Sequence, residues 1–237
     1  MTALHGTHTN NMTRPLIISI EGNIGAGKST LLARLQDHCA GRSDIVFLRE
    51  PVDIWEAVRD PADGQNILQK FYGDSAKYSF PFQIMAFMSR LSLIEGAIRE
   101  HPECSVIVCE RSLCADRNIF AKMLSDDGLI ESVCYQIYGK MYDEFSSKYV
   151  ADGIVYVDAE ADVCFRRIAK RGRDGEGGIA LDYLEKCKKY HDIWLLGETS
   201  TMLHLQTNED ATYEVGDIGY RWVTDTMEFI THIGSSE

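Results

Sequence analysis

The chain has 237 residues, 45% of them hydrophobic and 25% charged, which is typical of a soluble globular protein with one sizeable core. Its 36 acidic and 24 basic residues give a formal net charge of −12, which argues against binding nucleic acid polymers through a general basic surface. Seven cysteines without a C-x-x-C spacing favour reduced thiols over disulfides or zinc, and seven scattered histidines offer no metal motif. These features predict a reducing, cytoplasmic location.

Residues 1–14 form a polar lead that we expect to be disordered, followed by one domain over residues 15–237. The lead lacks the apolar stretch of a signal peptide and the arginine-rich composition of a transit peptide. No apolar run further along the chain approaches the length of a membrane span. The sequence therefore predicts a protein with no membrane partner.

The first predicted strand, 16–20, leads into a glycine-rich loop and a helix start. The loop has the spacing G-x-x-x-x-G-K-[ST], whose glycines bring backbone N–H groups close to an anion. Lys28 adds a charge that reaches the outer phosphates of a triphosphate, and Ser29 offers a hydroxyl to Mg²⁺. A strand, this loop and a helix N-terminus form a phosphate cradle. The predicted phosphate-binding residues are Gly22, Asn23, Ile24, Gly25, Ala26, Gly27, Lys28, Ser29 and Thr30.

Apolar runs alternate with helical spacings along the rest of the chain, which predicts an α/β fold with a five-stranded parallel sheet and helices on both faces. The predicted strands are 16–20, 45–48, 106–109, 154–157 and 202–205. Helical spacing marks the segments 31–39, 82–99, 116–123, 132–146, 161–170, 181–195 and 215–233. Residues 60–66 and 171–178 are rich in turn formers or glycine and are expected to be loops.

Charged side chains follow the predicted strands, at the edge where open α/β sheets bind ligands. Glu50 stands after the second strand, and Glu110 and Arg111 follow the third. The helix after the fourth strand ends in R-x-x-x-R-x-R, namely Arg167, Arg171 and Arg173. Two alternatives stay open here, because Glu50 could be a capping or salt-bridging carboxylate and the arginines could be a solvated helix end.

This set of side chains matches the needs of phosphoryl transfer. Arginines neutralise charge on the transferring group, while carboxylates orient Mg²⁺ or accept the proton of a hydroxyl. The glycine-flanked segment 171–178 is expected to close as a lid, because transfer to a hydroxyl must exclude water. A GTPase would need N-K-x-D, whereas residues 207–210 are TNED. We therefore predict a kinase.

Six segments occur in order, namely GNIGAGKST (22–30), REPV (49–52), NILQKFY (66–72), FPFQIMAFMSR (80–90), ERSLCADRNIF (110–120) and RGRDGEGGIALDYLEK (171–186). With them the chain resembles the deoxynucleoside kinase family, which includes deoxycytidine, deoxyguanosine and deoxyadenosine kinases. The resemblance runs from residue 16 to residue 210. It implies a P-loop kinase fold with an arginine-rich lid at about 167–178. It also implies transfer of the γ-phosphate of ATP to a deoxynucleoside 5′-hydroxyl in nucleotide salvage.

The resemblance also implies residue roles. Glu50 becomes the general base for the 5′-hydroxyl, Arg111 the arginine beside it, and Lys28 the third catalytic residue. Ser29 and Glu110 become the Mg²⁺ pair. Further donor contacts are expected from Arg167, Arg171, Arg173, Glu209 and Asp210. Substrate contacts are expected from Glu50, Trp55, Phe71, Tyr72, Phe82, Gln83, Ala86, Arg90, Arg111, Asp116, Phe120 and Glu176.

Within the substrate set, Tyr72 and Glu176 match the positions that bind the sugar 3′-hydroxyl, and Gln83 matches the amide that reads the base edge. Arg90 and Asp116 match the pair that separates deoxycytidine-type and purine-type members from thymidine-type members. An ionised Asp116 held by Arg90 would accept a hydrogen bond from the amino group of cytosine or adenine. We therefore expect deoxyadenosine and deoxycytidine as substrates, deoxyguanosine as a further candidate and thymidine as a poor one.

Several alternatives stay open. Core packing is the alternative role of Phe82 and Phe120. A nucleoside monophosphate kinase is the alternative enzyme, although Glu50 would repel an acceptor phosphate, and a non-catalytic structural subunit is the alternative class. Ala211 stands where close relatives carry an aromatic residue, so the donor is ATP or another triphosphate. Because family members pair through central helices, we expect a homodimer, with a larger homo-oligomer as the alternative.

Overall fold

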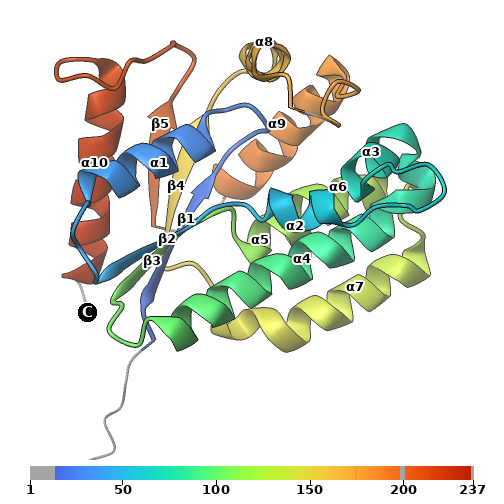
Figure 1. Ribbon diagram of the computed structural model, residues 1–237, viewed down its shortest axis with the longest axis horizontal. Helices are drawn as coiled ribbons and strands as arrows, with labels where there is room; N and C mark the ends of the chain where they lie inside the picture. Colours follow the sequence, from blue (N-terminus) through green and yellow to red (C-terminus); the bar gives the residue numbers. More distant parts are fainter. Residues whose placement is uncertain (1–13, 174, 198–200, 236–237) are drawn as a thin grey trace, which may run out of the picture.

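A sheet of five parallel strands organises the protein, which is described here from a computed structural model (Figure 1). The structure describes residues 14–173, 175–197 and 201–235. The strands are β1 (Leu16–Glu21), β2 (Ile45–Leu48), β3 (Val106–Glu110), β4 (Gly153–Asp158) and β5 (Met202–Gln206). Their order is β2-β3-β1-β4-β5, so β1 lies between β3 and β4. All five predicted strands and their parallel pairing are confirmed.

Helices connect the strands and cover both faces of the sheet (Figure 1). The α-helices are α1 (Lys28–His38), α2 (Val52–Ala57), α3 (Ile67–Gly73), α4 (Ser75–Glu100), α5 (Leu113–Ala115), α6 (Lys122–Asp126), α7 (Ser132–Phe145), α8 (Ala161–Arg171), α9 (Leu181–Leu195) and α10 (Ile218–Gly234). A π-helical turn, η1 (Asp116–Ala121), joins α5 to α6, and a 3₁₀ turn, η2 (Ser146–Lys148), follows α7. The predicted α/β class is therefore confirmed.

The two faces of the sheet carry separate apolar cores. Ile18 and Ile20 of β1 are buried against α1 and α10, whereas Ile17 is buried against Phe87 and Leu91 of α4. Figure 1 shows α1 and α10 on one side of the sheet and α4 and α7 on the other. Because both faces are covered, the strands need apolar residues at nearly every position, which explains their short continuous apolar runs.

Several predicted helix bounds were wrong. The helix α4 begins at Ser75 rather than at 82, and the side chain of Asp74 caps it by accepting the N–H of Lys77 at 3.2 Å. Pro81 lies inside this helix, where its missing N–H would usually mark a boundary. Phe80 and Phe82 pack into the cores beside it, so tertiary packing continues the helix.

Further differences concern short elements. The segment 116–123 divides into η1 and the start of α6, and the last helix begins at Ile218 rather than at 215. The helices α2 and α3 lie where no helix was predicted, on either side of the turn at 60–66. Both are only a turn or two long, which is too short for a clear helical periodicity.

The described part of the chain begins at an ion pair. Arg14 donates to both carboxylate oxygens of Asp152 at 2.7 Å. Residues 1–13, most of the predicted disordered lead, lie outside the described residues, as does Asp174 of the lid.

Among the described helices, none is long and apolar enough to cross a membrane. The seven cysteines all lie within the described residues and form no disulfide bond there.

Candidate active site

A cavity of about 490 Å³ opens at the carboxyl ends of the strands. Every site residue predicted from the sequence lines it except Gly22 and Asn23. These two instead fix the phosphate loop from behind. A Cβ atom at Gly22 would lie 2.2 Å from the carbonyl oxygen of Val157, and the Asn23 amide donates to the carbonyl of Leu184 at 2.9 Å.

The phosphate loop joins β1 to α1 and surrounds a buried lysine. Gly25 and Gly27 have φ values of 81° and 109°, in the left-handed region that glycine adopts without strain. The Lys28 ammonium donates to the carbonyl of Asn23 at 2.8 Å. Burial, reinforced by the nearby charge of Arg111, lowers the pKa of Lys28 to about 8. An anion in the loop would relieve this repulsion, so the buried lysine favours a phosphate partner.

Two oxygen-bearing side chains meet beside Lys28. The Ser29 hydroxyl donates to Oε1 of Glu110 at 2.7 Å, and both residues line the cavity. A hydroxyl and a carboxylate are oxygen ligands that suit Mg²⁺, which usually completes its shell with substrate phosphates and waters. Among the described residues no group of three or more histidine, cysteine or acidic side chains could hold a metal ion by itself. The pair fits an ion shared with phosphates.

Glu50 lines the cavity and is hydrogen-bonded to two arginines. Its Oε1 accepts from Nη2 of Arg90 at 2.5 Å and from Nε of Arg111 at 3.1 Å. Burial by itself would raise the pKa of Glu50, but Arg111, Arg90 and Lys28 together lower it to about 2. The Glu50 side chain keeps 19% of its surface exposed, so an ionised carboxylate is presented to the cavity. Glu50 is therefore a salt-bridging carboxylate, as the open alternative supposed, and it also lines the cavity.

At the far end of the cavity Arg90 also binds Asp116 of η1. The Asp116 carboxylate is almost completely buried, and burial raises its pKa to about 6 although Arg90 opposes the shift. Burial thus outweighs the effect that the sequence led us to expect from Arg90, and brings Asp116 closer to protonation at pH 7 than an exposed carboxyl. Among the described residues, three buried polar atoms at this end of the cavity have no hydrogen-bond partner, namely Oε1 of Gln83, Nε of Arg90 and Oδ2 of Asp116.

Aromatic rings form the walls around these polar atoms. The ring of Phe82 stacks on Phe71 at 4.8 Å and meets the edge of Trp55 at 5.3 Å between centroids. The Trp55 indole N–H donates to the Ser89 hydroxyl at 2.9 Å, which fixes its orientation. Phe82 and Phe120 are each 8% exposed and line the cavity, so they pack in the core and bound the site at once.

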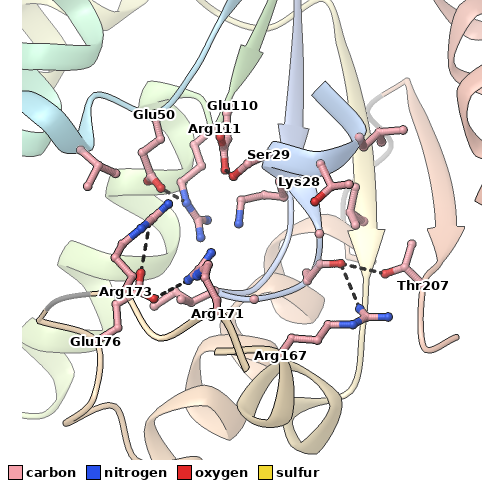
Figure 2. A pocket seen from close by; sticks show the side chains of 18 of the residues that line it. Lys28, Ser29, Glu50, Glu110, Arg111, Arg167, Arg171, Arg173, Glu176 and Thr207 are labelled. Carbon is pink, nitrogen blue, oxygen red and sulfur yellow. Dashed lines mark hydrogen bonds and ion pairs between the residues drawn. The ribbon is translucent and has the colours of Figure 1, made fainter. Parts of the chain in front are cut away.

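The lid arginines reach the cavity from α8 and the loop after it (Figure 2). Arg167 donates to the carbonyls of Ala26 and Glu209 at 3.3 and 2.8 Å, which connects the lid to the phosphate loop. Arg171 and Arg173 donate to the carboxylate of Glu176 at 2.5 and 3.2 Å. Figure 2 shows Lys28, Arg111 and Arg171 pointing into the same space. The predicted sugar ligand Glu176 is thus occupied by lid arginines.

Sequence reasoning missed several residues near the site. Thr207 follows β5, and its hydroxyl lies 3.3 Å from the Ala26 carbonyl and 3.1 Å from that of Asp158. Its place directly after a strand was the signal that could have revealed it. Tyr183 of α9 and Tyr213 also line the cavity. His191 lies behind Arg111 and was hidden in an ordinary helical pattern.

A triphosphate in the loop would direct its outer phosphate toward the region between Lys28 and Arg111, as in P-loop kinases. The parallel sheet, the loop after β1 and the lid after β4 give this chain the fold of that class.

Comparison with known proteins narrows the class. The family model for deoxynucleoside kinase matches residues 18–224. Deoxycytidine kinase of Homo sapiens is 37% identical over 222 residues, covering 86% of this chain and 82% of the relative. The mitochondrial deoxyguanosine kinase of Xenopus laevis is 32% identical over 203 residues, covering 77% of this chain and 74% of the relative. The chain belongs to the deoxynucleoside kinase family, as the resemblance in its motifs predicted.

Proposed function

We propose that the protein transfers the γ-phosphate of ATP to the 5′-hydroxyl of a deoxynucleoside with an amino-bearing base. The observation that carries the proposal is the unpaired set of buried atoms on Gln83, Arg90 and Asp116. Buried polar groups are rarely left without partners, and these three belong to side chains that line a cavity with aromatic walls. A flat, polar-edged base would satisfy them.

The charges at this end of the cavity favour particular bases. An ionised Asp116 can only accept hydrogen bonds, Arg90 can only donate, and the Gln83 amide can do both. Cytosine and adenine each present an amino donor next to a ring nitrogen acceptor, which matches the set. Thymine would bring a carbonyl oxygen toward the Asp116 carboxylate. We therefore favour deoxyadenosine and deoxycytidine, keep deoxyguanosine as a further candidate, and expect thymidine to be poor.

Glu50 is the proposed general base, because its carboxylate binds both Arg90, at the base end of the cavity, and Arg111, near Lys28 of the phosphate loop. With a pKa near 2 it is ionised at every physiological pH. A base this weak accepts the hydroxyl proton only as the bond to phosphorus forms and the hydroxyl becomes acidic, which suits a loose transition state. Arg111, bound to Glu50, is proposed to neutralise charge on the transferring group.

The phosphate loop and the lid are proposed to hold the donor. Lys28, the loop amides and the three lid arginines would contact its phosphates, and Glu209 and Asp210 would border the donor base. Ser29 and Glu110 would bind Mg²⁺, which supplies charge neutralisation between the outer phosphates. Tyr72 and Glu176 are the proposed 3′-hydroxyl ligands, since each Glu176 oxygen accepts from only one arginine and keeps a second acceptor site.

The two competing functions fit this cavity less well. In a nucleoside monophosphate kinase the acceptor carries a phosphate, and the ionised Glu50 would repel it. A structural subunit would have no need for a buried lysine, a shared carboxylate and a lid of arginines around one cavity. A salvage kinase uses all of them.

The proposal is tested with purified protein, ATP and Mg²⁺, and the four deoxynucleosides and their monophosphates as acceptors. Deoxycytidine or deoxyadenosine should give the highest kcat/KM, thymidine the lowest, and the monophosphates no measurable ADP formation above background. Thymidine as the best acceptor would refute the proposed base contacts. Faster phosphorylation of any monophosphate would instead support the monophosphate kinase.

We also propose a homodimer that forms through α4 and α7. These helices lie side by side (Figure 1) and expose large apolar side chains, namely Met88, Val133, Ile137 and Phe145. In Ile137→Lys a charge would enter the interface, so the mass measured by light scattering should fall to that of one chain. Ile193→Lys on α9, also an exposed isoleucine, is the control and should leave the mass unchanged. A larger wild-type particle would support the alternative assembly.

A further inference from the structure

Arg111 is held on its backbone and on its side chain. Its φ of 66° is in the left-handed region, which is uncommon for a residue with a side chain. The backbone is fixed on both sides, because the Arg111 N–H donates to the carbonyl of Ile20 at 3.0 Å, and the N–H and hydroxyl of Ser112 donate to Glu21 at 2.8 and 2.6 Å. A strained backbone at a site is held by the structure around it.

The guanidinium of Arg111 contacts three other side chains. Its Nε donates to Glu50 at 3.1 Å, and its central carbon lies 4.7 Å from the centre of the Phe120 ring. Its Nη1 lies 3.5 Å from Nε2 of His191. Glu50 and Phe120 line the cavity, whereas His191 stands behind Arg111 and does not.

The tautomer of His191 follows from its other ring nitrogen. His191 is completely buried in α9, and its Nδ1 lies 2.6 Å from the carbonyl oxygen of Cys187, one turn earlier. A carbonyl oxygen only accepts, so Nδ1 carries a proton. A neutral ring then has a lone pair on Nε2, facing the N–H of Arg111.

The surroundings of His191 keep the ring neutral. Burial lowers the pKa of His191 well below its usual value, and the charges of Arg111 and Lys28 act in the same direction. The carbonyls of Cys187 and Gly22 favour the protonated ring but are outweighed. A protonated ring would meet Arg111 with like charge. The neutral ring is therefore the form that can bind it.

We propose that His191 is a positioning residue for Arg111. Nε2 of His191 accepts a hydrogen bond from Nη1 of Arg111 and so holds the guanidinium toward the transferring phosphoryl group. The inference rests on the proposed function for the role of Arg111, while the contact and the tautomer stand without it. His191 touches no reacting atom. Its contribution should therefore appear in kcat and leave the KM values for both substrates within about twofold, because only an interaction made in the transition state is weakened.

Two substitutions at His191 distinguish a role as hydrogen-bond acceptor from a role in filling space. His191→Leu fills the space without an acceptor and should lower kcat about tenfold, the effect of one charged hydrogen bond. His191→Gln places an amide oxygen near the position of Nε2 and should recover most of that loss. Leu195→Ala, one turn further along α9 in a different apolar cluster, is the stability control. It should lower the thermal midpoint while kcat stays close to the wild-type value.

The coupling to Arg111 is tested by a double-mutant cycle. In an Arg111→Lys background, His191→Leu should change kcat by less than about twofold, since its partner is gone. A full tenfold loss in that background, or a His191→Gln enzyme as slow as His191→Leu, would overturn the proposal.

A second measurement needs no turnover. In ¹⁵N-labelled protein, Nδ1 of His191 should resonate as a protonated and Nε2 as an unprotonated ring nitrogen between pH 6 and 8. The opposite tautomer, or a charged ring, would overturn the inference. An inactive wild-type protein with the expected tautomer would instead refute the proposed function and leave the contact intact.

Discussion

The two ends of the cavity are built in different ways. The core of the proposed donor end is one continuous segment, residues 22–30, which is joined in the cavity by the lid arginines. The base end is assembled from side chains of α2, α3, α4 and η1, elements up to about 65 residues apart along the chain. In the proposed function the donor end binds phosphates common to all nucleotides, whereas the base end distinguishes acceptors. Substitutions at the donor end should therefore lower activity for all acceptors alike, whereas substitutions at the base end should change the selectivity among acceptors.

The largest expected effect lies at the donor end. Lys28→Ala removes the buried charge from the phosphate loop, and kcat/KM should fall about 10²- to 10³-fold, the scale of losing one electrostatic contact to the transition state. Because the loop does not contact the acceptor base, the loss should be equal for every deoxynucleoside. Steady-state kinetics with four acceptors measure it. Lys186→Ala, an exposed lysine paired with Asp127, is the control and should behave as wild type.

Glu50 stands where the two ends meet. Glu50→Gln keeps the shape but removes the charge that faces Arg90 and Arg111, and kcat should fall about 10²-fold, the usual contribution of a general base. The loss should again be similar for all acceptors. Glu95→Gln on α4 is the matched control. A Glu50→Gln enzyme with wild-type kcat would show that Glu50 is only a salt-bridging carboxylate.

The base end should control selectivity. Asp116→Asn turns an acceptor into a group that also donates, so it should tolerate the carbonyl of thymine. The ratio of kcat/KM for deoxycytidine over thymidine should fall about 10- to 100-fold, which corresponds to one specific base contact. Asp126→Asn, whose carboxylate pairs with Lys122 outside the cavity, should leave the ratio unchanged. An unchanged ratio in Asp116→Asn would contradict the proposed orientation of the base.

The same carboxylate predicts a dependence on pH. The pKa of Asp116 is raised to about 6, so the group gains a proton as the pH falls through that value. The neutral acid is a poorer acceptor, and kcat/KM for deoxycytidine should fall about tenfold by pH 5, one unit lower. Profiles from pH 5 to 8 should show this limb in wild type and lose it in Asp116→Asn. If Asp116→Asn kept the acidic limb of the pH profile with the same midpoint, the limb would belong to another titrating group.

The smallest effect is expected at Thr207. Its hydroxyl contacts the Ala26 carbonyl of the phosphate loop, so Thr207→Val should loosen the loop and raise the KM for ATP a few-fold, the size of one neutral hydrogen bond. The KM for the deoxynucleoside should stay constant. Thr226→Val is the matched control, because its hydroxyl donates to the carbonyl of Trp222 within α10. Equal changes in both variants would point to general destabilisation.

The contrast between the two ends also explains what the sequence could predict. The strands and the phosphate loop follow from local patterns, an apolar run and a spaced motif, and both were found from the sequence. The base end depends on side chains brought together only by folding, so it was reached through the family resemblance. Pairing of Glu176 with Arg171 and Arg173 had no local signal. The contact between His191 and Arg111 also had no local signal, because a helical pattern does not indicate which distant residue a histidine will contact.

The central claim is that one end of the cavity serves every acceptor and the other end selects among them. The most direct test is the ratio of kcat/KM for deoxycytidine over thymidine, measured in parallel for wild type, Lys28→Ala and Asp116→Asn. We predict that Lys28→Ala keeps the wild-type ratio despite its large loss of activity, while Asp116→Asn lowers the ratio about 10- to 100-fold. A ratio that changes equally in both variants would contradict the division of the cavity into two ends.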